Sequence, residues 1–397
     1  MGKSIFVILD FSASKVFTHH WKSIETFSKL LAKESFHYKV LIPKYAQKSL
    51  LSNLLNVERV LISTDFGPTF SEMPSIRIAN ELIKRYLHKL PVTIKHKVCK
   101  FLLSIYTQRA RKQIVKLSAA HEKVIVLVPS AEPLSVFTFL ELHDKRIPNL
   151  EWRLRLIGSQ ERGLLSRGNE TELLLAAITR NPEGVQIGYE TFPYQHFLQE
   201  QGFQNAALHW SPFPSDEKQL SKEPREFFRL GFLGSAKERK GFESIPSIFN
   251  AISNHHSRIE FFVQESAYPW NGYAEPHQLL SKNGQVKLLP SELSDEDLTN
   301  YISSCDLIIL PYDSESYALA ASAILYHAAD LHVPVMCPEG VGFAGEIEKY
   351  NVGLVYKDFS AYSDFPATLE KFLEIKTTDY IRYNQARDDS NRKFLLS

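Results

Sequence analysis

The stretch LGFLGSAKERKG, residues 230–241, carries the strongest structural signal in this chain. Its apolar run ends at Gly234, a basic loop follows, and a helical pattern begins after Gly241. Glycine lets the backbone approach a ligand closely, and lysines beside a helix N-terminus suit a diphosphate. The spacing is not that of a P-loop, and a solvated basic turn is the alternative interpretation of this loop.

On both sides of this stretch, short runs rich in Val, Ile and Leu alternate with longer helical patterns. We expect strands at 229–233, 259–263, 286–288, 307–310, 333–336 and 353–356, and helices at 242–252, 295–303, 317–329 and 361–374. Regular alternation of strands and helices is typical of a doubly wound parallel sheet. The sequence therefore predicts a Rossmann-like C-terminal domain over residues 212–375.

The first half of the chain shows the same alternation. Its expected strands are 5–9, 39–42, 59–62, 124–128 and 152–157, and its expected helices are 23–33 and 133–143. The Pro- and Ser-rich residues that follow it indicate a linker. We expect an α/β fold with two Rossmann-like, doubly wound parallel-sheet domains that face each other across a cleft, where ligands of such sheets bind. The expected parts are an N-terminal domain at 1–211 with a helical insertion at 71–120, the C-terminal domain at 212–375, and a helical tail at 376–397 that packs back on the N-terminal domain.

A second signal follows the strand expected at 307–310. Pro311 and Tyr312 lead into a polar loop and then into an almost wholly apolar helical stretch, which should be buried. Ser322 and His327 are its polar interruptions. Asp313 and its neighbouring acids suit a helix N-terminus as caps, although they would repel a phosphate there.

These two signals together resemble the C-terminal domain of GT-B glycosyltransferases, in particular the large retaining family often called family 4. The resemblance covers roughly residues 228–357 and rests on Gly234, Lys240, Gly241, Pro311, Tyr312, Ser322 and the Pro334-Val335 pair. It implies a nucleotide-diphosphate-sugar donor, UDP- or GDP-linked, with no cofactor and no metal, and retention of anomeric configuration. The donor-binding residues that it implies are Gly234, Ser235, Lys237, Lys240, Gln264, Leu289, Tyr312, Ser322 and His327.

Three positions depart from the family pattern. Ser235 stands where an arginine is expected, and Lys237 or Arg239 are candidate substitutes. His327 replaces the glutamate that holds the nucleotide ribose, although a neutral imidazole can still hydrogen-bond a hydroxyl. His332 replaces a glycine.

The N-terminal half resembles the family less. His19, His20 and Trp21 could line an acceptor site, and the alternative is a helix start packed by the indole ring. The histidines expected at two strand ends are missing. The residues near those strand ends, and hence the catalytic candidates, are Glu132, Ser159, Gln160 and Arg162.

The charge of the chain is unevenly distributed. The formal net charge is +1, but residues 1–211 hold 28 basic and 18 acidic residues, and residues 212–397 hold 18 and 27. Residues 77–116 alone carry 11 Lys/Arg and one acid. A basic helical insertion suits an anionic membrane surface and a lipid-linked acceptor. The alternatives are a solvated helical face and a nucleic-acid surface, and no nucleic-acid motif accompanies the basic residues.

Three widely spaced cysteines give no disulfide framework, and no CxxC motif or acidic cluster has metal-ligand spacing. The N-terminal apolar run is too short for a signal peptide. We expect a cytoplasmic protein, peripheral on the inner face of a membrane, that makes a cell-surface polysaccharide by transferring sugar to a glycan, lipid-linked or protein acceptor. A non-catalytic GT-B subunit that binds or regulates is the alternative.

Overall fold

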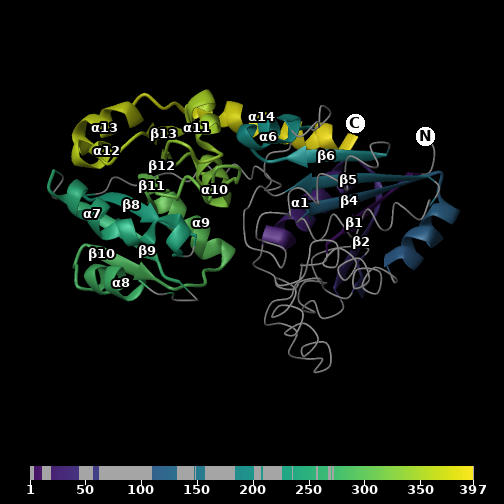
Figure 1. Cartoon of the computed structure of the whole chain (residues 1–397), viewed down its shortest axis with the longest axis horizontal. Coiled ribbons are helices and arrows are strands. Elements are labelled where there is room, and N and C mark those ends of the chain that lie inside the picture. Colours follow the sequence, from purple (N-terminus) through teal and green to yellow (C-terminus); the bar gives the residue numbers. More distant parts are fainter. Residues whose placement is uncertain are drawn as a thin grey trace, which may run out of the picture. The chain divides into compact units, whose positions relative to one another are not determined.

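The structure is a computed structural model (Figure 1), and it describes residues 4–10, 19–43, 57–61, 110–131, 147, 149–156, 184–200, 207–208, 226–234, 236–255, 258–266, 270 and 272–396. The chain divides into two compact units. The first comprises Met1–Tyr189, Gln195–Pro212 and Arg392–Ser397, and the second comprises Glu190–Tyr194 and Phe213–Asn391.

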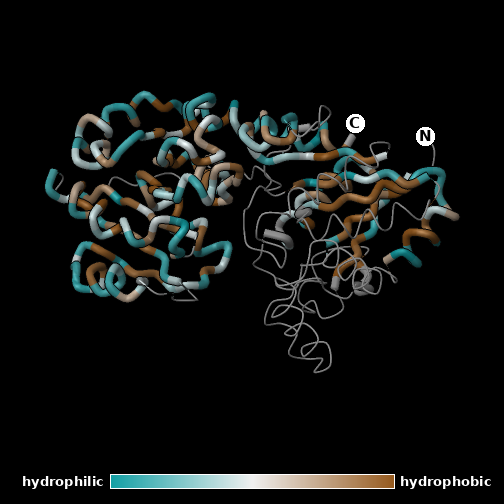
Figure 2. Tube along the Cα trace, viewed as in Figure 1, coloured by the Kyte–Doolittle hydropathy of each residue, from teal (hydrophilic) through white to brown (hydrophobic). Residues whose placement is uncertain are grey.

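The first unit holds a parallel sheet with the strand order β3-β2-β1-β4-β5-β6-β7. Its strands are β1 (Ser4–Leu9), β2 (His37–Pro43), β3 (Val57–Leu61), β4 (Lys123–Ala131), β5 (Leu150–Leu156), β6 (Val185–Tyr189) and β7 (Ala207–Leu208). Figure 2 shows the central strands as hydrophobic along most of their length, which is typical of parallel strands covered on both faces. Its helices include α1 (His19–Lys33) and most of α6 (Phe192–Glu200), and residues 110–120 of the predicted insertion are also helical.

One face of this sheet is packed by α1. Trp21, Ile24, Phe27 and Leu31 recur at helical spacing and are all buried against the sheet. Two side chains from the end of α14 (Thr377–Leu396), Phe394 and Leu395, belong to the same buried cluster. The last turn of the chain is therefore part of the first unit's core.

The second unit holds a parallel sheet with the order β10-β9-β8-β11-β12-β13. Its strands are β8 (Phe228–Phe232), β9 (Ile259–Gln264), β10 (Val286–Leu289), β11 (Leu307–Ile309), β12 (Val335–Pro338) and β13 (Gly353–Tyr356). The strand order reverses between β8 and β11, which is the position where doubly wound sheets bind ligands. The prediction of two parallel-sheet α/β domains is confirmed.

The helices of the second unit lie between these strands in the chain. They are η3 (Glu238–Lys240), η4 (Phe242–Ser244), α7 (Ile245–Ser253), α8 (Ala274–Ser281), α9 (Asp295–Ser304), α10 (Ala323–Asp330), α11 (Ala344–Tyr350), α12 (Ser360–Ser363), α13 (Phe365–Phe372) and most of α14. In the described part of the chain, no helix is both long enough and apolar enough to cross a membrane.

Several helices begin later than the sequence pattern predicts. The helix predicted at 317–329 starts only at Ala323, because Ser322 is its N-cap and accepts a hydrogen bond from the Leu325 N–H at 3.5 Å. The stretches predicted as helices at 242–252 and 361–374 are each divided. In both, the longer helix restarts with a proline in its first turn, where the missing N–H costs nothing.

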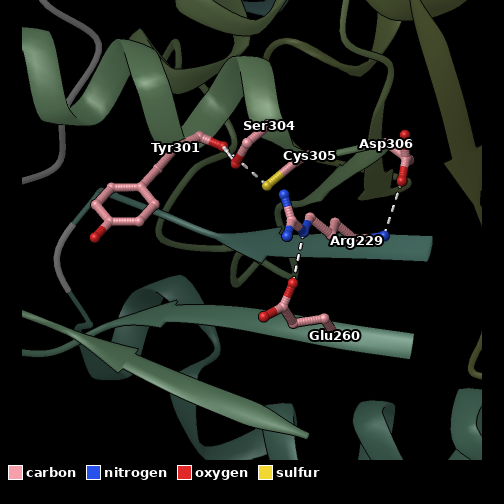
Figure 3. A network of polar contacts seen from close by, with 6 residues as sticks. All are labelled: Arg229, Glu260, Tyr301, Ser304, Cys305 and Asp306. Atoms are coloured by element: carbon pink, nitrogen blue, oxygen red, sulfur yellow. Dashed lines mark hydrogen bonds and ion pairs between the residues drawn. The ribbon is translucent and has the colours of Figure 1, made fainter. Parts of the chain in front are cut away.

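A polar network joins the starts of β8, β9 and β11 (Figure 3). The Arg229 N–H donates to the Asp306 carboxylate at 2.8 Å, and the Asp306 N–H donates back to the Arg229 carbonyl at 2.8 Å. The Arg229 side chain pairs with Glu260 at 2.5 Å. These contacts fix the two central strands at the sheet edge where the strands begin.

We expect Asp306→Ala to lower the free energy of unfolding by about 1–2 kcal/mol, because it leaves the Arg229 N–H without its acceptor. Asp306→Asn keeps a carbonyl oxygen in the same place and should cost less than half as much. Urea denaturation followed by circular dichroism measures both variants. Equal losses would show that the main-chain hydrogen bond is not the cause.

The backbone conformation of His332 is one that favours glycine, which is the residue expected at this position from the family resemblance. Its φ is 54°, in the left-handed region, and its ring stacks on Tyr380 of α14 with centroids 5.2 Å apart. Glycine would adopt this backbone conformation without strain, whereas His332 adopts it with its ring stacked on Tyr380.

We expect His332→Val to lower the free energy of unfolding by about 2 kcal/mol, because a β-branched residue is strained at positive φ and the ring stack is lost. His332→Gly loses only the stack, so its cost should stay below about 1 kcal/mol. Thermal melts of both variants against the parent protein compare the two costs. A glycine variant as unstable as the valine variant would contradict this explanation.

Candidate functional site

The candidate site lies where β8 and β11 end, at the reversal of strand order in the second unit. Gly234 follows β8 with a φ of +94°. A β-carbon there would lie 2.7 Å from Cγ1 of Ile324, in the first turn of α10. Glycine therefore allows the β8 loop and the N-terminus of α10 to approach each other closely.

The basic loop packs directly on the end of β11. Gly241 has a φ of +71°, and a β-carbon on it would collide with the Pro311 carbonyl oxygen. The Asp313 N–H donates to the Arg239 carbonyl at 3.0 Å. The two strongest sequence signals thus form one structural unit.

Lys240 is the central cation of this unit. Its half-buried ammonium donates a hydrogen bond to the Gly234 carbonyl and lies 5.6 Å from the centre of the Tyr312 ring. Loss of solvation, together with the nearby charges of Lys237 and Arg239, lowers the pKa of Lys240 to about 7. Within the described residues, no carboxylate forms an ion pair with this lysine. An entering anion would therefore supply the missing counter-charge.

Two tyrosines support the basic loop. The rings of Tyr312 and Tyr317 lie 4.5 Å apart, and the Arg239 guanidinium lies 5.6 Å from the Tyr317 ring. Burial raises the pKa of Tyr312, whose hydroxyl shares a hydrogen bond with Ser322. The Tyr312 hydroxyl is therefore protonated at neutral pH and links the basic loop to the N-cap of α10.

The C-terminal end of α10 is fixed by a buried ion pair. Asp330 pairs with the fully buried Arg387 of α14 at 2.8 Å. Beside this pair, the Tyr383 hydroxyl donates to Glu346 at 2.7 Å, and burial raises the pKa of Glu346 to about 8. Since Ser322 caps the other end, α10 presents its N-terminus to the site from a rigid position.

The structure brings together five of the predicted donor residues, which are Gly234, Lys240, Gln264, Tyr312 and Ser322. The Gln264 amide, only 6% exposed, contacts main-chain groups on both sides, as described below. Leu289 is buried at the end of β10, and its carbonyl accepts from the Glu265 N–H at 3.0 Å. The Lys237 side chain is exposed and His327 lies half-buried in the last turn of α10, while Ser235 lies outside the described residues.

The sequence pattern names Arg239 only as a candidate substitute for the arginine expected at position 235, and not as one of the implied donor-binding residues. Its role depends on Tyr317, which is remote in sequence and comes near only through the contact of two loops. The one sequence signal for this contact is that a cation, Arg239, and an aromatic residue, Tyr317, each follow a predicted strand. Ser291 was also not predicted, because its carbonyl accepts a hydrogen bond from Gln264, which is remote from it in sequence.

Most of the candidate residues predicted in the first unit lie outside the described part of the chain. Glu132, Ser159, Gln160 and Arg162 lie outside the described residues, as does the basic insertion before residue 110. His19 and His20 begin α1, but their side chains are not among those described. Trp21 is 3% exposed and belongs to the core cluster, so its ring is placed as the packing alternative expects. No group of three metal-ligating side chains occurs among the residues described.

The comparisons with known proteins bear on the fold. No protein-family model matches the sequence, and a search of curated proteins finds no relative. Solved structures do match over nearly the whole chain. HepE from Anabaena in complex with UDP-glucose has a TM-score of 0.65 at 12% identity, with 98% of each chain covered.

A sucrose-phosphate synthase from Thermosynechococcus elongatus has a TM-score of 0.64 at 12% identity, covering 98% of this chain and 97% of that one. The fold is GT-B. A Listeria monocytogenes protein named as a UDP-N-acetylglucosamine 2-epimerase also matches, with a TM-score of 0.58 at 12% identity, covering 100% of this chain and 95% of that one. One fold thus serves more than one reaction, and the reaction here has to be argued from the site.

Proposed function

We propose that this protein is a glycosyltransferase that uses a nucleotide-diphosphate sugar as donor. The observation that carries the proposal is Lys240, a half-buried ammonium without a carboxylate partner in the described chain. It lies beside Gly234 and faces the first turn of α10, where main-chain N–H groups also favour anions. A diphosphate suits this combination of donors and positive charge.

The chemical task of the site would be to stabilise the leaving diphosphate. When the glycosidic bond to the donor breaks, negative charge accumulates on the terminal phosphate oxygen. Lys240 and the N-terminus of α10 would neutralise that charge, which makes a metal unnecessary. Retention of anomeric configuration is part of the proposal on the strength of the family resemblance alone.

We propose a UDP-linked donor first and a GDP-linked donor second, since HepE was solved with UDP-glucose and with UDP. The acceptor would be a glycan, a lipid-linked saccharide or a protein. Isothermal titration with UDP-, GDP- and dTDP-sugars tests the donor, and product analysis distinguishes transfer from epimerisation. Folded protein that binds none of them would refute the proposal.

A non-catalytic GT-B protein is the second candidate, favoured by His327 and Ser235 in place of the family's charged residues. It predicts nucleotide binding without sugar transfer and without donor hydrolysis. Overnight incubation with a radiolabelled donor that binds, followed by chromatography, separates the two candidates. Release of free sugar or of a glycosylated product would exclude the non-catalytic one.

The basic residues 77–116 are proposed to contact an anionic membrane surface. We expect the protein to sediment with liposomes that contain about one third anionic lipid and to remain in solution with neutral liposomes. Each basic residue near an anionic surface contributes about 1 kcal/mol to binding. Added salt should reverse the binding. Equal recovery in both supernatants would refute this part of the proposal.

A further inference from the structure

Gln264, the last residue of β9, joins two loops that flank its strand. Its side-chain oxygen accepts a hydrogen bond from the Gly234 N–H at 2.6 Å. Its side-chain nitrogen donates to the Ser291 carbonyl at 3.0 Å. The side chain is almost completely buried, so these contacts are made in a place where water cannot replace them easily.

The main chain of Gly234 is thereby held through both of its polar groups. Gln264 binds its N–H, and the Lys240 ammonium binds its carbonyl. The loop after β10 is tied to the same strand by the Glu265 N–H, which donates to the Leu289 carbonyl at 3.0 Å. The buried Gln264 amide thus adds a side-chain link to the main-chain hydrogen bonds that set the spacing between the ends of β8 and β10.

This spacing matters for a ligand that lies across the strand ends. In doubly wound sheets, ligands occupy the crevice outside the carboxyl ends of the strands, and a nucleotide extends from the first strand toward its neighbours. With the diphosphate at Gly234 and Lys240, the nucleoside would extend over β9 toward Ser291. The two ends of one ligand would therefore be held by the two loops that Gln264 connects.

We propose that Gln264 is a positioning residue that fixes the loop at Gly234 relative to the loop at Ser291, so that a nucleoside diphosphate is held at both ends at once. The inference rests on the proposed nucleotide-sugar function. It assigns Gln264 an indirect role through main-chain groups of the site. Apolar packing at the end of β9 would not require a residue that both donates and accepts.

The test compares one ligand that spans both loops with one that reaches only the first. Pyrophosphate and the best-binding nucleoside diphosphate among UDP, GDP and dTDP are titrated calorimetrically into the full-length protein. The variants are Gln264→Met, which keeps the length and removes both hydrogen bonds, and Gln264→Asn, which keeps the amide but is too short to reach both partners. Gln278→Met, an exposed change on α8, is the matched control.

We expect Gln264→Met to lower the binding affinity for the nucleoside diphosphate by about tenfold or more, and the affinity for pyrophosphate by less than about threefold. Gln264→Asn should fall between Gln264→Met and the parent protein, and it serves as the decisive variant if the methionine variant does not fold. Gln278→Met should bind both ligands as the parent does. Equal weakening of both ligands, or of neither, would overturn the positioning role while leaving the proposed function intact. Parent protein that binds no nucleoside diphosphate would refute the proposed function, and the inference with it.

Discussion

Replacing Lys240 by methionine should weaken binding of the donor sugar nucleotide by about 10- to 100-fold, which corresponds to about 1.5–3 kcal/mol for a hydrogen bond to a charged group. Methionine keeps much of the length and apolar stem of lysine but carries no charge. The loss is expected to be large because the diphosphate would remain buried beside Gly234 without its counter-charge. Isothermal titration with a UDP-sugar measures it.

Two controls separate charge from damage to the loop. Lys371→Met removes an exposed lysine of α13, more than 100 positions from the basic loop in the sequence. It should change the affinity for the donor by less than about twofold. Lys240→Arg keeps the charge while changing the geometry, so it should recover part of the binding. A Lys240→Met protein that melts normally and binds the donor as tightly as the parent would exclude the basic loop as the diphosphate site.

Strands could be predicted from the sequence because their residues are buried on both faces. Ile8 and Val126 are fully buried members of apolar runs that need no knowledge of their neighbours to be recognised. Helix starts were less predictable, since they depend on single caps. The apolar pattern after Tyr317 continues through Ser322, and only the observed hydrogen bond to the Leu325 N–H shows where α10 begins.

The candidate site was predictable in its residue types and not in its contacts. Gly234 and Lys240 stand out because they lie between an expected strand and an expected helix, where glycine permits close approach to a ligand and lysine suits an anion. The partners of Gln264 lie 30 and 27 positions away along the chain, and no periodicity connects them. Arg387 and Asp330, 57 positions apart, are equally inaccessible to pattern reasoning, although their ion pair fixes the end of α10.

The excess of acids in the second half of the chain does not conflict with the proposed anion site, because the relevant electric field is local. Residues 212–397 carry an excess of acids, but Lys237, Arg239 and Lys240 lie within one short loop, and burial limits the screening of Lys240. The cost of this arrangement is visible in the lysine itself. Burial, followed by the charges of Lys237 and Arg239, lowers the pKa of Lys240 to about 7, so the free protein holds the proton of this lysine only weakly at neutral pH.

Donor binding should therefore take up a proton. A bound diphosphate favours the charged ammonium and raises the pKa of Lys240, whereas the free protein has a pKa of about 7. Well below pH 7 the lysine is charged in both states and no proton is exchanged. Above pH 7 the free lysine is largely neutral, so proton uptake should approach one per donor. Affinity should then fall by up to about tenfold per pH unit until the pKa of the bound state is reached.

The measurement is calorimetric titration between pH 6 and 9 in pairs of buffers with different ionisation enthalpies, because the difference in observed heat gives the number of protons exchanged. A sugar nucleotide is the proper ligand, since its diphosphate is esterified at both ends and does not titrate near neutrality. In Lys240→Arg the guanidinium stays charged throughout this range, so both the proton uptake and the fall in affinity should disappear. Persistence of either in the arginine variant would show that a different group takes up the proton, and absence of both in the parent protein would mean that Lys240 is already fully charged before the donor arrives.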